Sequence, residues 1–122
     1  MEVRVARVYD PPAAQEGVRV LVDRLWPRGI KKETAPWEHW LPEVAPSTDL
    51  RQWFGHEAAK FELFQKQYLS ELASPKGRAA VQRLTGLAAG GTLLLLTATA
   101  DTEHNQAVVL RRLLLGEVAA PR

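Results

Sequence analysis

The sequence predicts an α/β fold: a small single domain with a mostly parallel central sheet of three to four strands and helices packed on it. Residues 92–97, TLLLLT, form an apolar run of strand length that follows Gly90 and Gly91, the pattern of a central strand covered on both faces. Two strand patterns precede this run, and helical patterns lie between and after them. No repeat or low-complexity linker divides residues 1–122, so one domain is expected.

The first strand is expected within residues 3–9, VRVARVY. Val3 and Val5 share one face with an arginine between them, which predicts an edge strand with one face toward solvent. Asp10-Pro11-Pro12 ends this strand, because proline lacks the N–H donor that a ladder needs, and a loop is expected up to Gly17.

A second and more apolar strand is expected at residues 18–23, VRVLVD. The stretch from residue 30 to residue 46 holds three prolines, too many for a long helix. It predicts a loop with a short strand or a turn of helix near residues 37–41. Helices on both faces of the central strand at 92–97 are expected to complete the core.

Helix signals follow this loop. Ser47, Thr48 and Asp49 after Pro46 predict the start of a short helix that ends near Gly55. A second helix is expected at residues 57–72, because apolar residues recur there at spacings of three and four. This buried stripe consists of Phe61, Phe64, Tyr68 and Leu72.

Two more helices are expected in the second half of the chain. Ser74-Pro75 breaks the preceding helix and opens a third one, which ends at Gly90-Gly91. The last helix is expected at about residues 104–115, with Asp101 or Thr102 as its N-terminal cap.

Composition excludes several classes of function. The absence of cysteine removes disulfides, thiolate metal sites and cysteine nucleophiles, and it fits a reducing compartment, so a cytoplasmic location is predicted. The net charge of +2 is spread without a single-sign block, so nucleic acid is not a favoured partner. No signal peptide and no apolar run of about 18 residues is present, so no membrane association is expected. The motifs of the well-marked cofactor-dependent and hydrolase classes are missing, so no cofactor is assigned and no metal site is predicted.

Polar side chains follow two of the predicted strands. Ligands of open α/β sheets bind outside the carboxyl ends of the strands, so the segments after Asp23 and after Thr97 should lie side by side there. In LVDRLWPRG, Arg24 and Arg28 flank Trp26 and could hold a phosphate or carboxylate beside a flat ring. The structural alternative places Trp26 in the core, which is favoured for this residue, and pairs the arginines with acids on the surface.

The segment after Thr97 holds a compact polar run, Asp101 to Asn105, and capping accounts for only one of its residues. His104 could take part in proton transfer, and Asn105 offers both a donor and an acceptor. For His104 alone, a packed imidazole bonded to Asp101 is an equally good interpretation. In a third motif, LRQWFGHE, Arg51 is either a solvated helix residue or another arginine directed at the same pocket.

Three motifs in this order, LVDRLWPRGIKKE, APSTDLRQWFGHE and DTEHNQAVVL, resemble the YeaO-like branch of a large family catalogued as a domain of unknown function, DUF488. The resemblance extends from residue 8 to the last helix. It implies a compact α/β domain of bacteria and archaea, with the motif residues gathered at one end of the sheet. It implies no particular activity.

The chain departs from the wider family after the central strand. Many wider-family members carry two cysteines there, whereas this chain has Thr97 and Asn105 at the corresponding positions and Gln106-Ala107 where a histidine and an arginine would follow. Any thiol chemistry of those relatives is therefore not carried over. In the closer branch a lysine commonly precedes the acidic turn, and Ala100 at this position weakens an anion-binding interpretation of that loop.

The leading hypothesis is an arginine-edged pocket that binds a small anionic or nucleotide-like molecule and acts as a hydrolase or group transferase. In it Arg24 and Arg28 hold the anion, and His104 serves as acid or base with its tautomer fixed by Asp101. The remaining ligand-binding residues of this hypothesis are Asp23, Asn105 and Arg51.

The alternative is a non-catalytic binding or regulatory module that contacts protein or nucleic acid through an aromatic and basic surface. Its candidate residues are Trp26, Trp37 and Trp53. Exposed tryptophans beside Arg24 or Arg51 favour this alternative, and buried ones favour the pocket.

Overall fold

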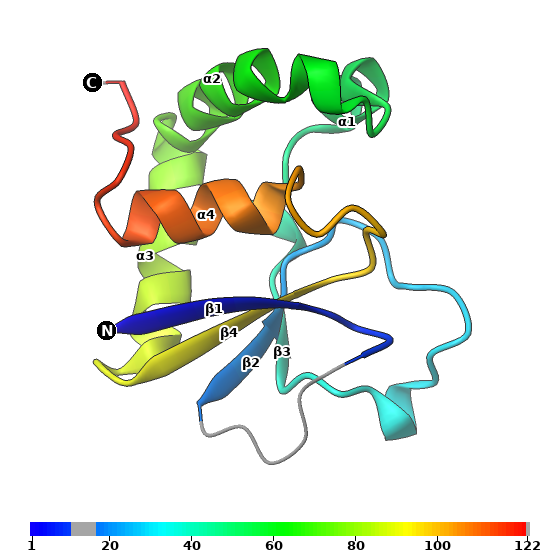
Figure 1. Cartoon of the computed structure of the whole chain (residues 1–122). Coiled ribbons are helices and arrows are strands. Elements are labelled where there is room, and N and C mark those ends of the chain that lie inside the picture. Colours follow the sequence, from blue (N-terminus) through cyan, green and yellow to red (C-terminus); the bar gives the residue numbers. More distant parts are fainter. Residues whose placement is uncertain (11–16, 122) are drawn as a thin grey trace.

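The computed structural model describes residues 1–10 and 17–121, and in this part of the chain four parallel strands form one sheet (Figure 1). The strands are β1 (Glu2–Arg7), β2 (Val18–Leu21), β3 (His39–Trp40) and β4 (Thr92–Thr97). Their order in the sheet is β1-β4-β2-β3, so β4 is central and β1 is an edge strand, as predicted. The loop predicted to start at Pro11 lies largely outside the described residues.

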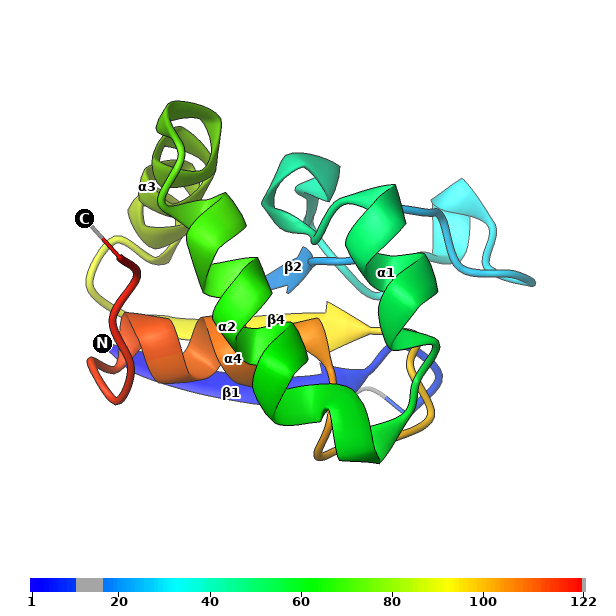
Figure 2. The same ribbon diagram turned by 90° about the horizontal axis from the view of Figure 1, so that it is seen from above.

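Four α-helices complete the fold, and the α/β prediction is confirmed with a sheet that is parallel throughout. They are α1 (Thr48–Phe54), α2 (Phe61–Leu72), α3 (Pro75–Ala88) and α4 (Gln106–Leu114). Short 3-10 turns lie at Lys32–Thr34, Pro42–Val44 and Ala58–Lys60. All four helices contribute buried side chains to one apolar core, which Leu93 and Leu95 of β4 join from the sheet. Seen from above, α4 lies along β1 and β4 (Figure 2).

The other face of the sheet differs from the prediction of helical cover. Leu94 and Leu96 of β4 point to this face, because side chains alternate along a strand, and they form a second and smaller core with Leu21. Ile30 and Trp37 pack against that core from the loop after β2. Among the described residues no α-helix contributes to this second core, so an apolar loop covers the face on which a helix was expected.

Two helices begin later than predicted. The 3-10 turn at Ala58–Lys60 precedes α2, which starts at Phe61 and not at residue 57. Helix α4 starts at Gln106, and its cap is Asn105, whose Oδ1 accepts from the amide of Val108 at 3.0 Å. The prediction that Asp101 or Thr102 caps this helix is wrong, because the turn ends four residues later than the sequence pattern indicated.

Helix α2 fixes the segment that leads into α1. The buried Tyr68 hydroxyl donates to the carbonyl oxygen of Val44 at 2.6 Å. The Glu71 carboxylate accepts from the amide and the hydroxyl of Ser47, at 2.8 and 2.6 Å, and Ser47 in turn caps α1 as predicted. Together these bonds hold residues 44–47 against the core, and this segment forms one wall of the cavity described below.

Replacing Tyr68 by phenylalanine is expected to lower the free energy of unfolding by about 1–2 kcal/mol, since the buried Val44 carbonyl loses its donor. Urea denaturation measures the change. Tyr9→Phe is the matched control, because the Tyr9 hydroxyl donates to the carbonyl of Arg28 on an exposed surface. That control should change stability by less than about 0.5 kcal/mol, and equal losses in the two variants would contradict the role assigned to Tyr68.

Candidate functional site

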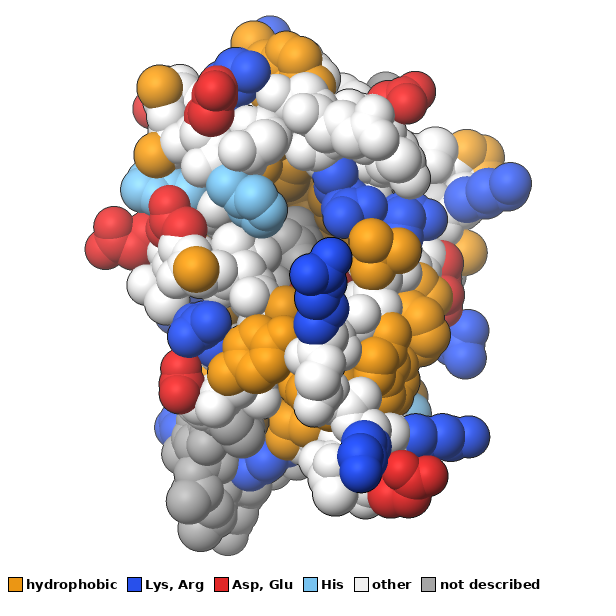
Figure 3. Space-filling view, turned by 90° about the vertical axis from the view of Figure 1, so that its right-hand side faces the viewer, with side chains coloured by type: hydrophobic (Ala, Val, Ile, Leu, Met, Phe, Trp, Pro, Cys, Tyr) orange, Lys and Arg blue, Asp and Glu red, His pale blue; other side chains and the backbone are white. Residues whose placement is uncertain are grey.

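A cavity of about 540 Å³ lies at the carboxyl ends of β2 and β4, where the polar motifs were expected to meet. The loop after β2, the segment before α1, α1 itself and the start of α4 enclose it. Figure 3 shows this end of the molecule, with a hollow that Lys or Arg side chains border on one side and His side chains on the other. The polar side chains that line the cavity are Asp23, Arg24, Thr48, Arg51, Gln52, His56, Thr99, Asn105 and Gln106.

Asp23 joins the two strands at the floor of the cavity. Its carboxylate accepts from the hydroxyl of Thr97 and from the amide of Ala98, both at 2.7 Å, and from the side-chain amide of Gln106. Burial raises the pKa of Asp23 above its usual value, although these hydrogen bonds and the charge of Arg51 act in the opposite direction. The carboxylate therefore lies half-buried, well bonded and close to a cation.

Arg24 is anchored to the segment before α1. Its Nε donates to the carbonyl oxygen of Pro46 at 2.9 Å, and its Nη2 donates to that of Ala45 at 3.0 Å. Of the five N–H groups of the guanidinium, three are left without a bond to the described residues. Arg24 thus brings a fixed positive charge and spare donors to the cavity.

Arg51 approaches the same cavity from α1. Within the described residues its guanidinium has no hydrogen-bond or salt-bridge partner. Its positive charge favours the ionised form of Asp23 and partly offsets the effect of burial on the pKa of that carboxyl. Two guanidinium groups therefore share one cavity with a single carboxylate, which leaves an excess of positive charge.

About half of the residues that line the cavity are apolar. Its nonpolar lining consists of Leu25, Trp26, Pro27, Ala45, Pro46, Phe54, Phe64 and Ala98. The Trp26 side chain is 36% exposed, so the prediction that it belongs to the core is wrong. It packs edge-on against Trp37 and Trp40, with ring centroids 4.8 and 5.5 Å apart, and its indole N–H donates to the carbonyl of Ile30. These contacts join Trp26 to Trp37, which packs against the second core, and to Trp40 of β3.

His56 lines the cavity although the sequence hypothesis did not include it. It follows Gly55, the left-handed residue that ends α1, and its own φ is +60°. A non-glycine residue in this region costs of order 1 kcal/mol or more, and such strain is common at binding sites. Gln106, Thr48, Gln52 and Thr99 also line the cavity and were not among the predicted site residues. The glycine–histidine pair after α1 is a sequence signal for His56, and the polar first residue of α4 is one for Gln106.

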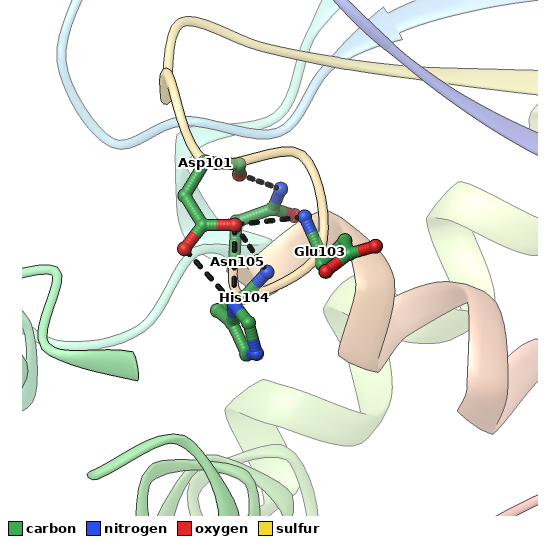
Figure 4. Close-up of polar contacts among 4 residues, drawn as sticks. All are labelled: Asp101, Glu103, His104 and Asn105. Carbon is green, nitrogen blue, oxygen red and sulfur yellow. Dashed lines mark hydrogen bonds and ion pairs between the residues drawn. The ribbon is translucent and has the colours of Figure 1, made fainter. Parts of the chain in front are cut away.

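Asp101 and His104 form a separate arrangement outside the cavity (Figure 4). An Asp101 oxygen accepts from the amides of Glu103 and His104, at 2.9 and 3.0 Å, and the other oxygen lies 2.9 Å from Nδ1 of His104. The two backbone bonds and His104 lower the pKa of Asp101. The imidazole packs edge-on against Phe61, with ring centroids 5.2 Å apart. Asp101 thus orders the turn before α4, and it also binds the ring of His104.

The structure brings together four of the residues that the sequence hypothesis assigned to the site: Asp23, Arg24, Arg51 and Asn105. The buried Asn105 amide is already engaged, because Oδ1 caps α4 and Nδ2 donates to the carbonyl of Asp101 at 2.8 Å. Arg28 is exposed in the loop after β2 and does not line the cavity. His104 lines a separate and more open depression with Phe61 and Arg112, and Asp101 binds its ring there. The predicted combination of two arginines with His104 is therefore not assembled around this cavity.

The described residues hold no cluster of three or more histidine, aspartate or glutamate side chains placed to bind a metal ion. Over the same part of the chain, no helix is long and apolar enough to cross a membrane.

Comparison with known proteins assigns the chain to a family. Residues 2–122 match a family described as "Inactive DUF488-N3 subclade". The chain belongs to this family. Its predicted kinship with the YeaO-like branch is confirmed, since it is 43% identical over 110 residues to the uncharacterised protein YeaO of Escherichia coli K12, a match that covers 90% of the chain and 94% of YeaO.

Relatives also occur in mycobacteria. The chain is 40% identical over 114 residues to the uncharacterised proteins Rv3073c of Mycobacterium tuberculosis H37Rv and Mb3100c of Mycobacterium bovis, with 93% of the chain and 94% of each relative covered. No solved structure matches the chain significantly. The relatives thus establish the family and leave the chemistry of the cavity to be argued from its own residues.

Proposed function

We propose that the chain binds a small anion in the cavity between Arg24 and Arg51, without converting it chemically. The observation that carries this proposal is the pair of guanidinium groups in one cavity, of which Arg51 has no hydrogen-bond partner among the described residues. An anion would neutralise the excess positive charge and accept hydrogen bonds from both groups. The cavity volume of about 540 Å³ is in the range of small-molecule sites.

Two observations favour binding over catalysis. His104, the acid or base of the sequence hypothesis, does not line the cavity, so it is not placed to exchange a proton with a ligand held by Arg24 and Arg51. The matched family is described as an inactive subclade, and Thr97 and Asn105 stand where the resemblance places cysteines in the wider family. The side chains gathered around Asp23 suit hydrogen bonding and lack a strong nucleophile.

A thermal-shift screen of nucleotides, sugar phosphates and organic acids, followed by calorimetry, tests the proposal. A ligand that binds the folded state raises the melting temperature by mass action. For such a ligand, Arg51→Gln is expected to raise Kd by about 10- to 100-fold, since it removes charge-assisted hydrogen bonds worth about 1.5–3 kcal/mol.

Arg28→Gln and His104→Gln are matched controls, because both residues belong to the sequence hypothesis and neither lines the cavity. Both should leave Kd nearly unchanged. Loss of binding in either control, with binding retained in Arg51→Gln, would place the ligand at the surface formed by the loop after β2 and the turn before α4, and would refute the cavity.

A second candidate function has one observation in its favour. Trp26 and Trp53, two of the three tryptophans of this alternative, are more than a third exposed, as is Trp40. Leu25 beside Trp26 is 62% exposed, so an exposed aromatic surface adjoins Arg24 as the alternative required. This surface supports a non-catalytic module that contacts protein or nucleic acid. Arg28 lies in the same loop, so Arg28→Gln should weaken such a partner while Arg51→Gln should not. Nucleic acid as the partner would also require binding that weakens steeply with salt.

A further inference from the structure

The charges in the cavity point to a ligand with a single negative charge. Arg24, Arg51 and Asp23 are the charged side chains that line it, with His56 as a further titratable group. The two guanidinium groups and an ionised Asp23 carboxylate leave one net positive charge, which one negative charge on the ligand balances. A phosphate monoester carries about −1.5 to −2 near neutral pH, so it would place excess negative charge in one cavity with the Asp23 carboxylate.

The available donors suit a planar anion. Arg24 uses Nε and Nη2 to hold two carbonyl oxygens, which leaves donors at the end of the guanidinium plane for the two oxygens of a carboxylate. Phosphate sites usually add several backbone amides at helix N-termini. Here the amides of Leu50 in α1 and Val108 in α4 are taken by the caps Ser47 and Asn105.

A third backbone donor near the floor is also occupied, since the amide of Ala98 donates to Asp23. These three amides are not available to a tetrahedral anion, so its charge would rest mainly on the two guanidinium groups. A carboxylate needs no more than these two groups offer, because each guanidinium edge can bind both of its oxygens.

The apolar walls require more than a bare anion. Leu25, Trp26 and Pro27 form one wall, while Phe54 and Phe64, stacked with ring centroids 4.3 Å apart, contribute another. An ion the size of acetate or inorganic phosphate would leave the exposed faces of Leu25 and Trp26 in contact with water, whereas Phe54 and Phe64 are already buried. Burying apolar ligand surface against those exposed faces is favourable by roughly 25 cal/mol per Å², so a flat hydrocarbon body should add to affinity.

We infer that the cavity selects an organic monocarboxylate with a flat apolar body, of the aryl carboxylate class, over phosphate esters and over small inorganic anions. This inference rests on the proposed function, because it names the ligand class of the same site. Arg24 and Arg51 hold the carboxylate, and the ring packs on the exposed faces of Leu25 and Trp26. Thr99 and Gln52 at the edge can bond polar ring substituents.

Isothermal titration of the full chain with four probes tests the inference: 1-naphthoate, 1-naphthyl phosphate, acetate and inorganic phosphate. The first two share one ring system and differ in the anionic group, while acetate keeps the carboxylate and lacks the ring. We expect 1-naphthoate to bind about tenfold or more tightly than each of the others, with binding weakened by Arg51→Gln. Leu25→Ser, at an exposed position where the fold should tolerate it, should weaken 1-naphthoate as well.

The outcomes separate the inference from the proposed function. Equal or tighter binding of either phosphate, still sensitive to Arg51→Gln, overturns the carboxylate inference and leaves the anion site intact. Equal binding of acetate and 1-naphthoate overturns the role of the apolar walls. If no probe binds, or if binding is insensitive to Arg51→Gln, the proposed function fails and the inference fails with it.

Discussion

Gly77→Ala is expected to lower the free energy of unfolding by about 3 kcal/mol, at the upper end of the usual cost of overpacking. Gly77 is buried in the first turn of α3, where the chain passes close over the end of α2. A Cβ atom there would lie 2.4 Å from the carbonyl oxygen of Glu71 and 2.5 Å from Cα of Leu72. Both neighbours are backbone atoms, so the clash can be relieved only by moving one helix relative to the other.

Gly86→Ala in the same helix provides the control. A Cβ atom at Gly86 meets no atom within 4 Å, and the residue has ordinary helical backbone angles. The same substitution should therefore stabilise the protein by about 0.5–1 kcal/mol, because alanine loses less backbone entropy than glycine in a helix. Urea denaturation of both variants should give shifts of opposite sign. Shifts of the same sign and size would show that the close contact of α2 and α3 contributes nothing to stability.

The Gly77 variant should also affect the cavity at a distance. Glu71, whose carbonyl the new Cβ would push, holds Ser47 through its carboxylate, and Ser47 follows the Ala45–Pro46 wall that anchors Arg24. A displacement of the end of α2 therefore moves an anchor of the anion site. Weaker ligand binding in Gly77→Ala than in Gly86→Ala is the expected consequence.

The regular elements could be predicted because their signals are local. The apolar run at Thr92–Thr97 is β4 with the predicted bounds, and Ser47 and Gly55 delimit α1 as the capping pattern indicated. The start of α4 could not be fixed in this way. Asp101 and Asn105 are both good caps, and the choice between them depends on a turn in which Asp101 binds two backbone amides.

The position of the candidate site could be predicted from the sequence, but only some of the residues that line it could. The rule on strand ends correctly brought the segments after Asp23 and Thr97 together, because the register of β2 on β4 aligns Leu21 with Leu96. The direction of individual side chains is not encoded so simply. The pairing of His104 with Asp101 directs it toward Phe61, and a loop closed by tryptophan contacts leaves Arg28 in solvent. Arg51 lines the cavity from α1, whose cap Ser47 is held by Glu71 at the end of α2.

Asp23→Ala is expected to lower the free energy of unfolding by about 3 kcal/mol, because three donors around one carboxylate lose their acceptor. These donors are the Thr97 hydroxyl, the Ala98 amide and the Gln106 side chain. Asp23→Asn is the milder variant and should cost about 1–2 kcal/mol. Its oxygen can still accept from Ala98, while the hydroxyl and the Gln106 amide can rotate to accept from the new NH₂ group.

The same asparagine variant should bind an anion more tightly than the parent, since it removes the negative charge that opposes the ligand. Binding of 1-naphthalenesulfonate, which stays anionic, measured over a range of pH tests this. The parent and Asp23→Asn both carry His56→Gln in this experiment, which removes the other titratable group of the cavity. Arg24 and Arg51 keep their charge throughout. In the parent, binding should weaken as the pH rises through the raised pKa of Asp23, above the usual value of 3.8, because ionised Asp23 repels the anion. In Asp23→Asn the profile should be flat over that range.

The free energy of unfolding should depend on pH in the direction set by the raised pKa of Asp23. Burial makes folded Asp23 hold its proton to higher pH than the unfolded chain does, so its contribution is most favourable below the usual pKa of 3.8 and declines as the pH rises from there through the raised value. Above that range the burial of the ionised carboxylate lowers the free energy of unfolding by an amount that no longer changes with pH. Its hydrogen bonds still hold Thr97, Ala98 and Gln106 in place. If Asp23→Asn instead weakened anion binding at neutral pH, the Asp23 carboxylate would have to accept a hydrogen bond or an ion pair from the ligand. The ligand would then carry a cationic or donor group of its own and would not be a simple monocarboxylate.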